Sequence, residues 1–160
     1  MTPGHDLVLE RADLTSQAAR DLIHALNAEL SEAYAEPGAN HFSLEAADVA
    51  PGQGAFLVVR REGRPVGCGA VRLLDPSTAE LKRMYVEPAL RGGGIGGYLV
   101  EALEGEARRL GATRLVLETG TRQAAALALY RRCGFEPIPL FGEYCLSPVT
   151  SICLGKPLGS

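Results

Sequence analysis

The chain has 160 residues, 46% of them hydrophobic, and a formal net charge of −3, which suits one domain, residues 1–160, with a core of its own. This weakly acidic balance gives no reason to expect binding to nucleic acid or to an anionic membrane. No apolar run is long enough for a transmembrane helix or a signal peptide, so we expect a cytoplasmic protein.

The cysteines follow no redox or metal-binding spacing. Four are present, at Cys68, Cys133, Cys145 and Cys153, and none forms a CxxC pair. We therefore expect reduced thiols and no metal site.

The first half of the chain predicts a strand, a helix, a long connection and three further strands. Leucines at i, i+4 and i+8 give the first helix an apolar face, and Thr15 or Ser16 can cap it. The irregular stretch over residues 36–54 is long enough to be a binding loop. In order, the expected elements are strand Leu7–Glu10, a helix to about Tyr34, a short helix near Leu44–Val49, and strands Ala55–Arg60, Pro65–Leu74 and Ala79–Val86.

The second half predicts two helices and three short strands. A glycine run opens a helix whose apolar positions follow helical spacing, with Gly111 expected as its C′ residue. Next come strand Arg114–Glu118, a helix over about Arg122–Arg132, and strands Phe135–Ile138 and Thr150–Leu154. The order predicts an α/β fold with a mixed, mostly antiparallel central sheet, helices on both faces, and a crossover around the glycine run.

The glycine run is the strongest local signal in the chain. The segment Arg91-Gly92-Gly93-Gly94-Ile95-Gly96-Gly97 has five glycines in six positions. At a helix start, bare backbone N–H groups and the helix dipole favour an anion, most simply phosphate. The alternative, a plain tight turn, does not need so many glycines.

The same glycines also satisfy a dinucleotide-binding pattern. Gly92, Gly94 and Gly97 match GxGxxG, and Glu118 follows about 20 residues later. However, residues 87–91 separate the strand from the glycines, and too little chain follows for the rest of a dinucleotide fold. A nucleotide-dependent oxidoreductase therefore stays as an alternative that NAD binding would test.

Two motif blocks resemble a known family. The first is Arg-x-x-Gly-x-Gly at Arg91, Gly94 and Gly96, after a strand ending Met-Tyr-Val and a proline. The second runs from Gln123 to Phe135, similar to Asn-x-x-Ala-x-x-Leu-Tyr-x-x-x-Gly-Phe, with Gln in place of Asn. Over roughly residues 55–157 the chain resembles the GCN5-related N-acetyltransferase (GNAT) superfamily.

The resemblance implies acetyl-CoA as donor and a primary amine as acceptor. The backbone amides of the glycine run would hold the pyrophosphate of coenzyme A, with Arg91 at the loop entrance. The central strand would bulge near Met84 to Val86 and splay from strand Arg114–Glu118, and the pantetheine arm would lie in that gap. The implied cofactor-binding residues are Met84, Tyr85, Val86, Arg91, Gly92, Gly93, Gly94, Ile95, Gly96, Gly97, Gln123 and Tyr130.

The resemblance also suggests catalytic groups. Tyr130 stands at the family's general-acid position; the alternative is a tyrosine packed in the core. Glu80 lies six residues before Val86, where some members carry a catalytic base, and even spacing predicts Glu80, Met84 and Val86 on one strand face. Glu118 is the rival base. Either carboxylate can instead be structural, with water relaying the amine proton.

The acceptor is the least defined part of the prediction. His24 falls on the first helix, and His41 on the irregular loop that would border the acceptor pocket. Residues 141–144 could form another wall, where Glu143 would attract a cationic amine. We predict a small-molecule amine acetylated by direct attack in a ternary complex, in a possible homodimer. The alternatives are a non-catalytic acyl-CoA-binding sensor and an acetyltransferase of protein lysine or N-termini.

Overall fold

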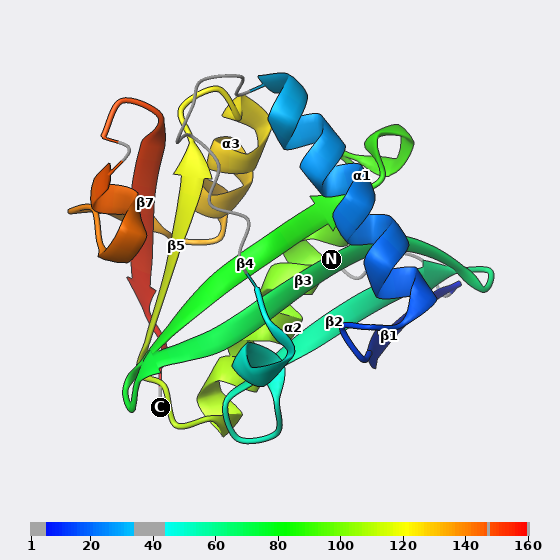
Figure 1. The fold of residues 1–160 in the computed structure, drawn as a ribbon, viewed down its shortest axis with the longest axis horizontal. Coiled ribbons are helices and arrows are strands. Elements are labelled where there is room, and N and C mark those ends of the chain that lie inside the picture. Colours follow the sequence, from blue (N-terminus) through cyan, green and yellow to red (C-terminus); the bar gives the residue numbers. More distant parts are fainter. Residues whose placement is uncertain (1–5, 34–43, 147, 160) are drawn as a thin grey trace.

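The computed structural model describes residues 6–33, 44–146 and 148–159 (Figure 1). The strands in this part of the chain are β1 (Leu7–Arg11), β2 (Gly54–Arg61), β3 (Arg64–Asp75), β4 (Thr78–Val86), β5 (Arg114–Gly120), β6 (Glu136–Ile138) and β7 (Ser151–Pro157). The α-helices are α1 (Gln17–Ala33), α2 (Ile95–Arg109) and α3 (Ala124–Arg132), and the 3-10 turns are η1 (Ala46–Val49), η2 (Pro88–Leu90) and η3 (Gly142–Leu146).

The described strands form one mixed sheet in the order β1-β2-β3-β4-β5-β7-β6. Neighbouring strands are antiparallel, except that β4 and β5 run parallel. A parallel pair needs a crossover connection, and α2 provides it. The predicted α/β class with a mostly antiparallel sheet is therefore confirmed.

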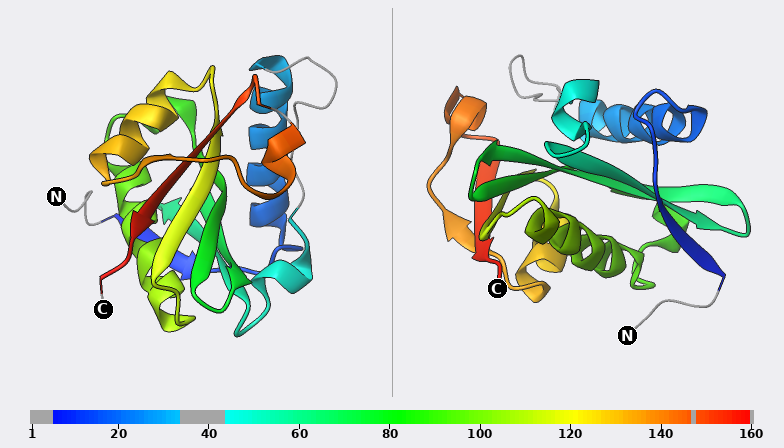
Figure 2. Two further views of the ribbon diagram at one scale, coloured as in Figure 1. Left: turned by 90° about the vertical axis from the view of Figure 1, so that its left-hand side faces the viewer. Right: turned by 90° about the horizontal axis from the view of Figure 1, so that it is seen from below.

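The helices cover both faces of the sheet, as predicted. In Figure 2, α1 lies on one face and α2 on the other, with α3 on the same side as α2. The larger apolar core lies between α2 and the sheet, where Leu99, Leu103 and Leu115 are fully buried. A smaller core under α1 is built around Phe56 and Val58. None of the helices in the described ranges has the length and apolarity needed to cross a membrane.

The predicted helix ends agree with the local hydrogen bonds where the structure describes them. The Ser16 hydroxyl accepts a hydrogen bond from the Ala19 N–H at 3.3 Å and caps the start of α1. Gly111 follows α2 with φ +93°, and its N–H donates to the Arg108 carbonyl at 3.0 Å. This is the predicted C′ position, which glycine adopts without Cβ strain. The predicted end of α1 near Tyr34 lies outside the described residues.

A β-bulge interrupts β4 near its end. Cys68 of β3 pairs with Tyr85 and Ala70 pairs with Lys82, so one residue of β3 opposes two of β4. Arg83 is one of these two and has φ +58°. The bulge therefore begins earlier than the predicted Met84 to Val86.

The bulge changes which side chains share a face. Met84 and Val86 pack into the core beneath α2, whereas Glu80 bonds to side chains on the α1 side of the sheet. The prediction that Glu80, Met84 and Val86 share one face is therefore wrong, because the extra residue shifts the two-residue alternation.

The parallel pair β4 and β5 is joined over only part of its length. Pairing runs from Thr78 with Arg114 to Leu81 with Leu117. Beyond these residues β4 continues to Val86 and β5 to Gly120, and the two strands diverge in Figure 1. The start of α2 and the whole of α3 lie beside this divergence, on the side away from α1.

Candidate active site

A cavity of about 800 Å³ lies beside the diverging ends of β4 and β5. This volume is in the range of small-molecule and cofactor sites. Its walls come from the end of β4, the glycine loop, the start of α2, α3 and the last turns of α1. The predicted cofactor residues that line it are Met84, Tyr85, Val86, Arg91, Gly92, Gly94, Ile95, Gly96, Gly97, Gln123 and Tyr130.

The glycine loop presents the start of α2 to this cavity. Gly92 and Gly94 have φ of +87° and +93°, which a residue with a Cβ rarely adopts. Gly94 precedes the first turn, and no side chain caps that turn. The first N–H groups of a helix have no partner within it, so this loop can offer its amides to an anion.

The glycines at the start of α2 have different physical roles. A Cβ on Gly96 would stand 2.8 Å from Cδ2 of Leu129, so Gly96 allows α2 to pack closely against α3. A Cβ on Gly97 would meet nothing within 4 Å, and the same holds for Gly92. Open space at these two positions is what a ligand on the loop requires.

Arg91 joins the glycine loop to β4 and α1. Its Nε donates to the Val86 carbonyl at 2.8 Å, and its Nη2 donates to Oε1 of Glu29 at 2.7 Å. The guanidinium also lies 5.6 Å from the ring centre of Tyr85. Both members of the Arg91–Glu29 pair are partly exposed, so the pair contributes little stability. Another anion can therefore replace Glu29 as the partner of Arg91 at small cost.

Gln123 stands at the start of α3 and holds the turn before it. Its Oε1 accepts hydrogen bonds from the Gly120 N–H at 3.0 Å and from the Thr119 hydroxyl at 3.4 Å. The carbonyl oxygen of the side chain is therefore used within the turn, and its amide nitrogen is the atom that can donate to a ligand.

Tyr130 lies in α3 and lines the cavity while being 93% buried. Its ring packs edge-on against Phe135, with ring centres 5.8 Å apart. Burial raises the pKa of the Tyr130 hydroxyl well above its usual value, and the charges of Cys133 and Glu118 raise it further. The phenol therefore keeps its proton at neutral pH, as a general acid must.

Glu80 is the most buried carboxylate of the site, at 1% exposure. The Arg72 Nε donates to its Oε1 at 3.0 Å, and the Tyr144 hydroxyl donates to its Oε2 at 2.6 Å. Lys82 Nζ donates to the same hydroxyl at 3.3 Å, and Arg72 also pairs with Asp48 at 3.3 Å. Both oxygens of Glu80 are thus already engaged.

Tyr144 belongs to the segment predicted to form a pocket wall, but its bond to Glu80 was not predicted. Burial raises the pKa of the Tyr144 hydroxyl far above its usual value, and the charge of Glu80 adds to the rise. The two residues are 64 positions apart in the chain, and no local motif relates them.

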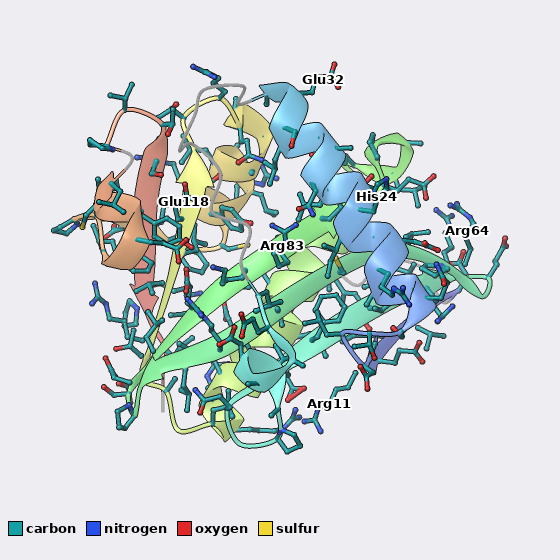
Figure 3. All side chains as sticks on the ribbon, viewed as in Figure 1. Arg11, His24, Glu32, Arg64, Arg83 and Glu118 are labelled. Carbon is teal, nitrogen blue, oxygen red and sulfur yellow. The ribbon has the colours of Figure 1, made fainter. Side chains whose placement is uncertain are left out.

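Glu118 lies on β5, one residue beyond the last pairing with β4. It is partly buried, and Figure 3 shows it beside the diverging strands. Its charge contributes to the raised pKa of both Tyr130 and Tyr144. Glu118 therefore lies within electrostatic reach of the predicted acid.

Of the two histidines considered as candidates, the structure describes only His24. His24 is exposed on α1, and Figure 3 shows it away from Glu118. His41 lies outside the described residues. Gly93 is exposed in the loop next to the cavity-lining glycines.

Sequence reasoning missed the part of the cavity that α1 and the ends of α3 supply. The additional lining residues with charged side chains are Glu29, Arg122 and Arg132. Arg122 Nη1 donates to the Ala33 carbonyl at 2.9 Å and so ties the end of α1 to the start of α3. Arg122 immediately precedes the second motif block and Arg132 lies within it, so the block was the available signal for both.

Two features define the acyl-CoA N-acyltransferase class of fold: a parallel strand pair that diverges, here β4 and β5, and an uncapped helix start beside the divergence, here that of α2. The profile of the Acetyltransferase (GNAT) family matches residues 19–135. An IAA acetyltransferase from Azospirillum brasilense is 39% identical over 154 residues, which is 96% of this chain and 99% of the relative. The chain belongs to the GNAT family of acetyltransferases.

Solved structures agree with this membership. A Klebsiella pneumoniae protein assigned as an acyl-CoA N-acyltransferase has a TM-score of 0.82 and 33% identity, covering 96% of this chain and 98% of that one. An acetyltransferase-like structure from Salmonella typhimurium with its cofactor acetyl-CoA has a TM-score of 0.71 and 20% identity, covering 96% and 95%. This second likeness shows the fold.

Replacing Tyr144 by Phe should test the buried bond to Glu80. Loss of the donor leaves Oε2 of Glu80 buried without it, so we expect a fall of about 1–3 kcal/mol in the free energy of unfolding at pH 7. Urea unfolding measures this. Tyr98→Phe on α2 is the matched control and should change stability by less than about 0.5 kcal/mol.

The pH dependence of the same pair of proteins gives a second readout. The folded-state pKa of Tyr144 is raised. Its contribution to the free energy of unfolding is therefore complete below the ordinary tyrosine pKa of about 10. It is lost as pH rises above that value, because the unfolded chain ionises first. The difference between wild type and Tyr144→Phe should therefore shrink above pH ~10. A constant difference there would contradict the assignment.

Proposed function

We propose that this chain uses acetyl-CoA to acetylate the primary amine of a small molecule, by direct attack in a ternary complex. The observation that carries the proposal is the cavity beside the end of β4, which the glycine loop and Tyr130 both line. Family membership and the acetyl-CoA in the Salmonella structure support the choice of donor.

The residues around the cavity fit coenzyme A. The uncapped start of α2 and the open space at Gly97 suit a pyrophosphate. Within the described residues, β4 pairs with β5 only as far as Leu81, so the backbone near Met84 and Val86 can bond an extended pantetheine arm as a strand would. Arg91 would exchange Glu29 for a phosphate.

Acetyl-CoA supplies a thioester, and the protein's groups handle the protons. The neutral amine nitrogen forms the new C–N bond while the C–S bond breaks. Tyr130 gives its proton to the departing sulfur, and the proton lost by the amine passes to a base or to water. A backbone N–H of β4 can stabilise the oxyanion that forms at the carbonyl.

Glu118 is the better candidate for the base. Glu80 already accepts hydrogen bonds on both oxygens and pairs with Arg72. Both of its oxygens therefore already have protein donors as partners, and Glu80 is buried. Glu118 stands at the divergence and within electrostatic reach of Tyr130, so it can receive the amine proton on the side opposite the acid.

Tyr130→Phe should lower kcat by about 10²-fold or more, because the sulfur leaves without general-acid help. The affinity for acetyl-CoA, measured by calorimetry, should stay within about twofold, since the ring and its packing are retained. Tyr98→Phe is the matched control. An unchanged kcat in Tyr130→Phe would remove Tyr130 as the acid.

Glu118→Gln and Glu80→Gln should separate the base from the structural carboxylate. We expect Glu118→Gln to lower kcat/KM by about 10²-fold and to flatten the acidic limb of its pH profile. Glu80→Gln should mainly lower the thermal midpoint, because it weakens the buried pair with Arg72. The reverse pattern would assign the base to Glu80. If neither variant alters the acidic limb of the pH profile of kcat/KM, water would be the proton acceptor.

The function itself is tested by calorimetric titration with acetyl-CoA, coenzyme A and NAD, followed by a thiol-release screen. The screen should include small amines, lysine-containing peptides, and IAA, the compound in the name of the Azospirillum relative. We expect acetyl-CoA binding, none for NAD, and thiol release with a class of small amine. Release with peptides alone would favour a protein substrate, and binding without any release would favour an acyl-CoA sensor.

A further inference from the structure

The last turn of α3 carries Tyr130, and a Schellman motif ends the helix directly after it. The Phe135 N–H donates to the Tyr130 carbonyl at 3.0 Å. The Gly134 N–H donates to the Arg131 carbonyl at 3.0 Å, and Gly134 has the positive φ, +95°, that this motif requires. The ring contact between Tyr130 and Phe135 is the apolar contact that accompanies the motif. The position of Tyr130 in the cavity therefore depends on how this helix end is held.

Lys156 of β7 binds the same helix end. Its Nζ donates to the Cys133 carbonyl at 2.7 Å, and the last carbonyls of a helix have no partner within it. The ammonium also lies 5.7 Å from the ring centre of Phe135, within the range of a cation–π contact. A positive charge at a helix C-terminus is favourable because it faces the negative end of the helix dipole. Lys156 thus contacts both the residue that ends α3 and the ring that packs against Tyr130.

Glu104 of α2 fixes the Lys156 ammonium in place. Its Oε2 accepts a hydrogen bond from Lys156 Nζ at 2.9 Å, and the two side chains are only 11% and 19% exposed. Replacing such a buried pair with apolar residues is often neutral or stabilising, so stability alone does not require charges here. Neither residue, although both are in the described part of the chain, lines the cavity. Their effect on the site must therefore pass through α3.

We propose that Lys156 is a positioning residue, which binds the end of α3 to α2 and so holds the Tyr130 hydroxyl at the reacting sulfur. This inference rests on the proposed function, because it needs Tyr130 as the acid. Helix α2 begins at the glycine loop, so the Lys156–Glu104 pair joins the helix of the acid to the helix that would hold the pyrophosphate. A displacement of about 1 Å can lower a rate by about 100-fold, so a contact outside the cavity can act on the reaction.

The competing role for Lys156 is to stabilise the fold. In that role its loss would lower the thermal midpoint, and any loss of activity would not depend on Tyr130. A positioning residue contributes to kcat only while the Tyr130 hydroxyl is present to be positioned. A double-mutant cycle measures this dependence directly.

The cycle is run on kcat, with acetyl-CoA and the amine that the thiol-release screen identifies. In the wild-type background, Lys156→Met should lower kcat by about 10- to 100-fold. The calorimetric affinity for acetyl-CoA should stay within about twofold, because the cavity walls are retained. In the Tyr130→Phe background, the same change should alter kcat by less than about twofold, because residues that act as a unit are not additive. Lys156→Arg keeps the cation and should restore most of the lost rate.

Arg131→Met is the matched control. Arg131 is an exposed cation in the same last turn of α3, so this change removes one positive charge from the helix end and keeps the Lys156 contacts. We expect kcat to be unchanged. If Lys156→Met fails to fold because Glu104 loses its partner, Lys156→Met combined with Glu104→Leu removes both charges and leaves no unpaired carboxylate. This double variant should show the same fall in kcat.

An equal fall in kcat in both backgrounds would assign Lys156 to the fold alone and overturn the inference. An unchanged kcat in Lys156→Met would overturn it as well. In both cases the proposed function would stand, because Tyr130→Phe alone would still lower kcat. Full activity in Tyr130→Phe would remove Tyr130 as the acid, and this inference with it. Absence of turnover with every amine would overturn the proposed function and this inference together.

Discussion

The short pairing of β4 with β5 is the constraint on which the rest of the site depends. The two parallel strands are hydrogen-bonded only up to Leu81 and Leu117. Beyond that point, the backbone groups of each strand have no partner on the other strand. Buried backbone groups need partners, so a divergence of this kind is stable where something else can occupy it. The cavity at the divergence and the bare start of α2 beside it are consistent with a ligand that supplies those bonds.

The bulge in β4 divides the site into two sides. Before it, Glu80 faces α1; after it, Met84 faces α2. One extra residue therefore gives β4 a polar surface on one side of the sheet and a cavity wall on the other. Gly69 makes this possible, because a Cβ there would lie 2.5 Å from Sδ of Met84. The proposed reaction needs these two sides, because protein groups on both of them must reach the thioester.

The sequence predicted the parts of the site that short motifs encode. The helix that begins after Gly94 follows from residues within one segment, as does the cavity-facing Tyr130. The predicted face of Glu80 was wrong because the bulge depends on how β4 aligns with β3, and neither segment specifies that alignment alone. The bond from Tyr144 to Glu80 was missed for the same reason, since it joins elements far apart in the chain.

Helix α1 connects the two sides of the site through three arginines. Arg91 of the glycine loop pairs with Glu29, Arg122 before α3 donates to the Ala33 carbonyl, and Arg83 of the β4 bulge donates to Asn27. The first of these bonds is partly exposed and weak, whereas the donor of the third, Arg83, is buried. A phosphate that draws Arg91 from Glu29 would therefore remove one weak contact of α1, while the bonds from Arg122 and Arg83 to the same helix remain.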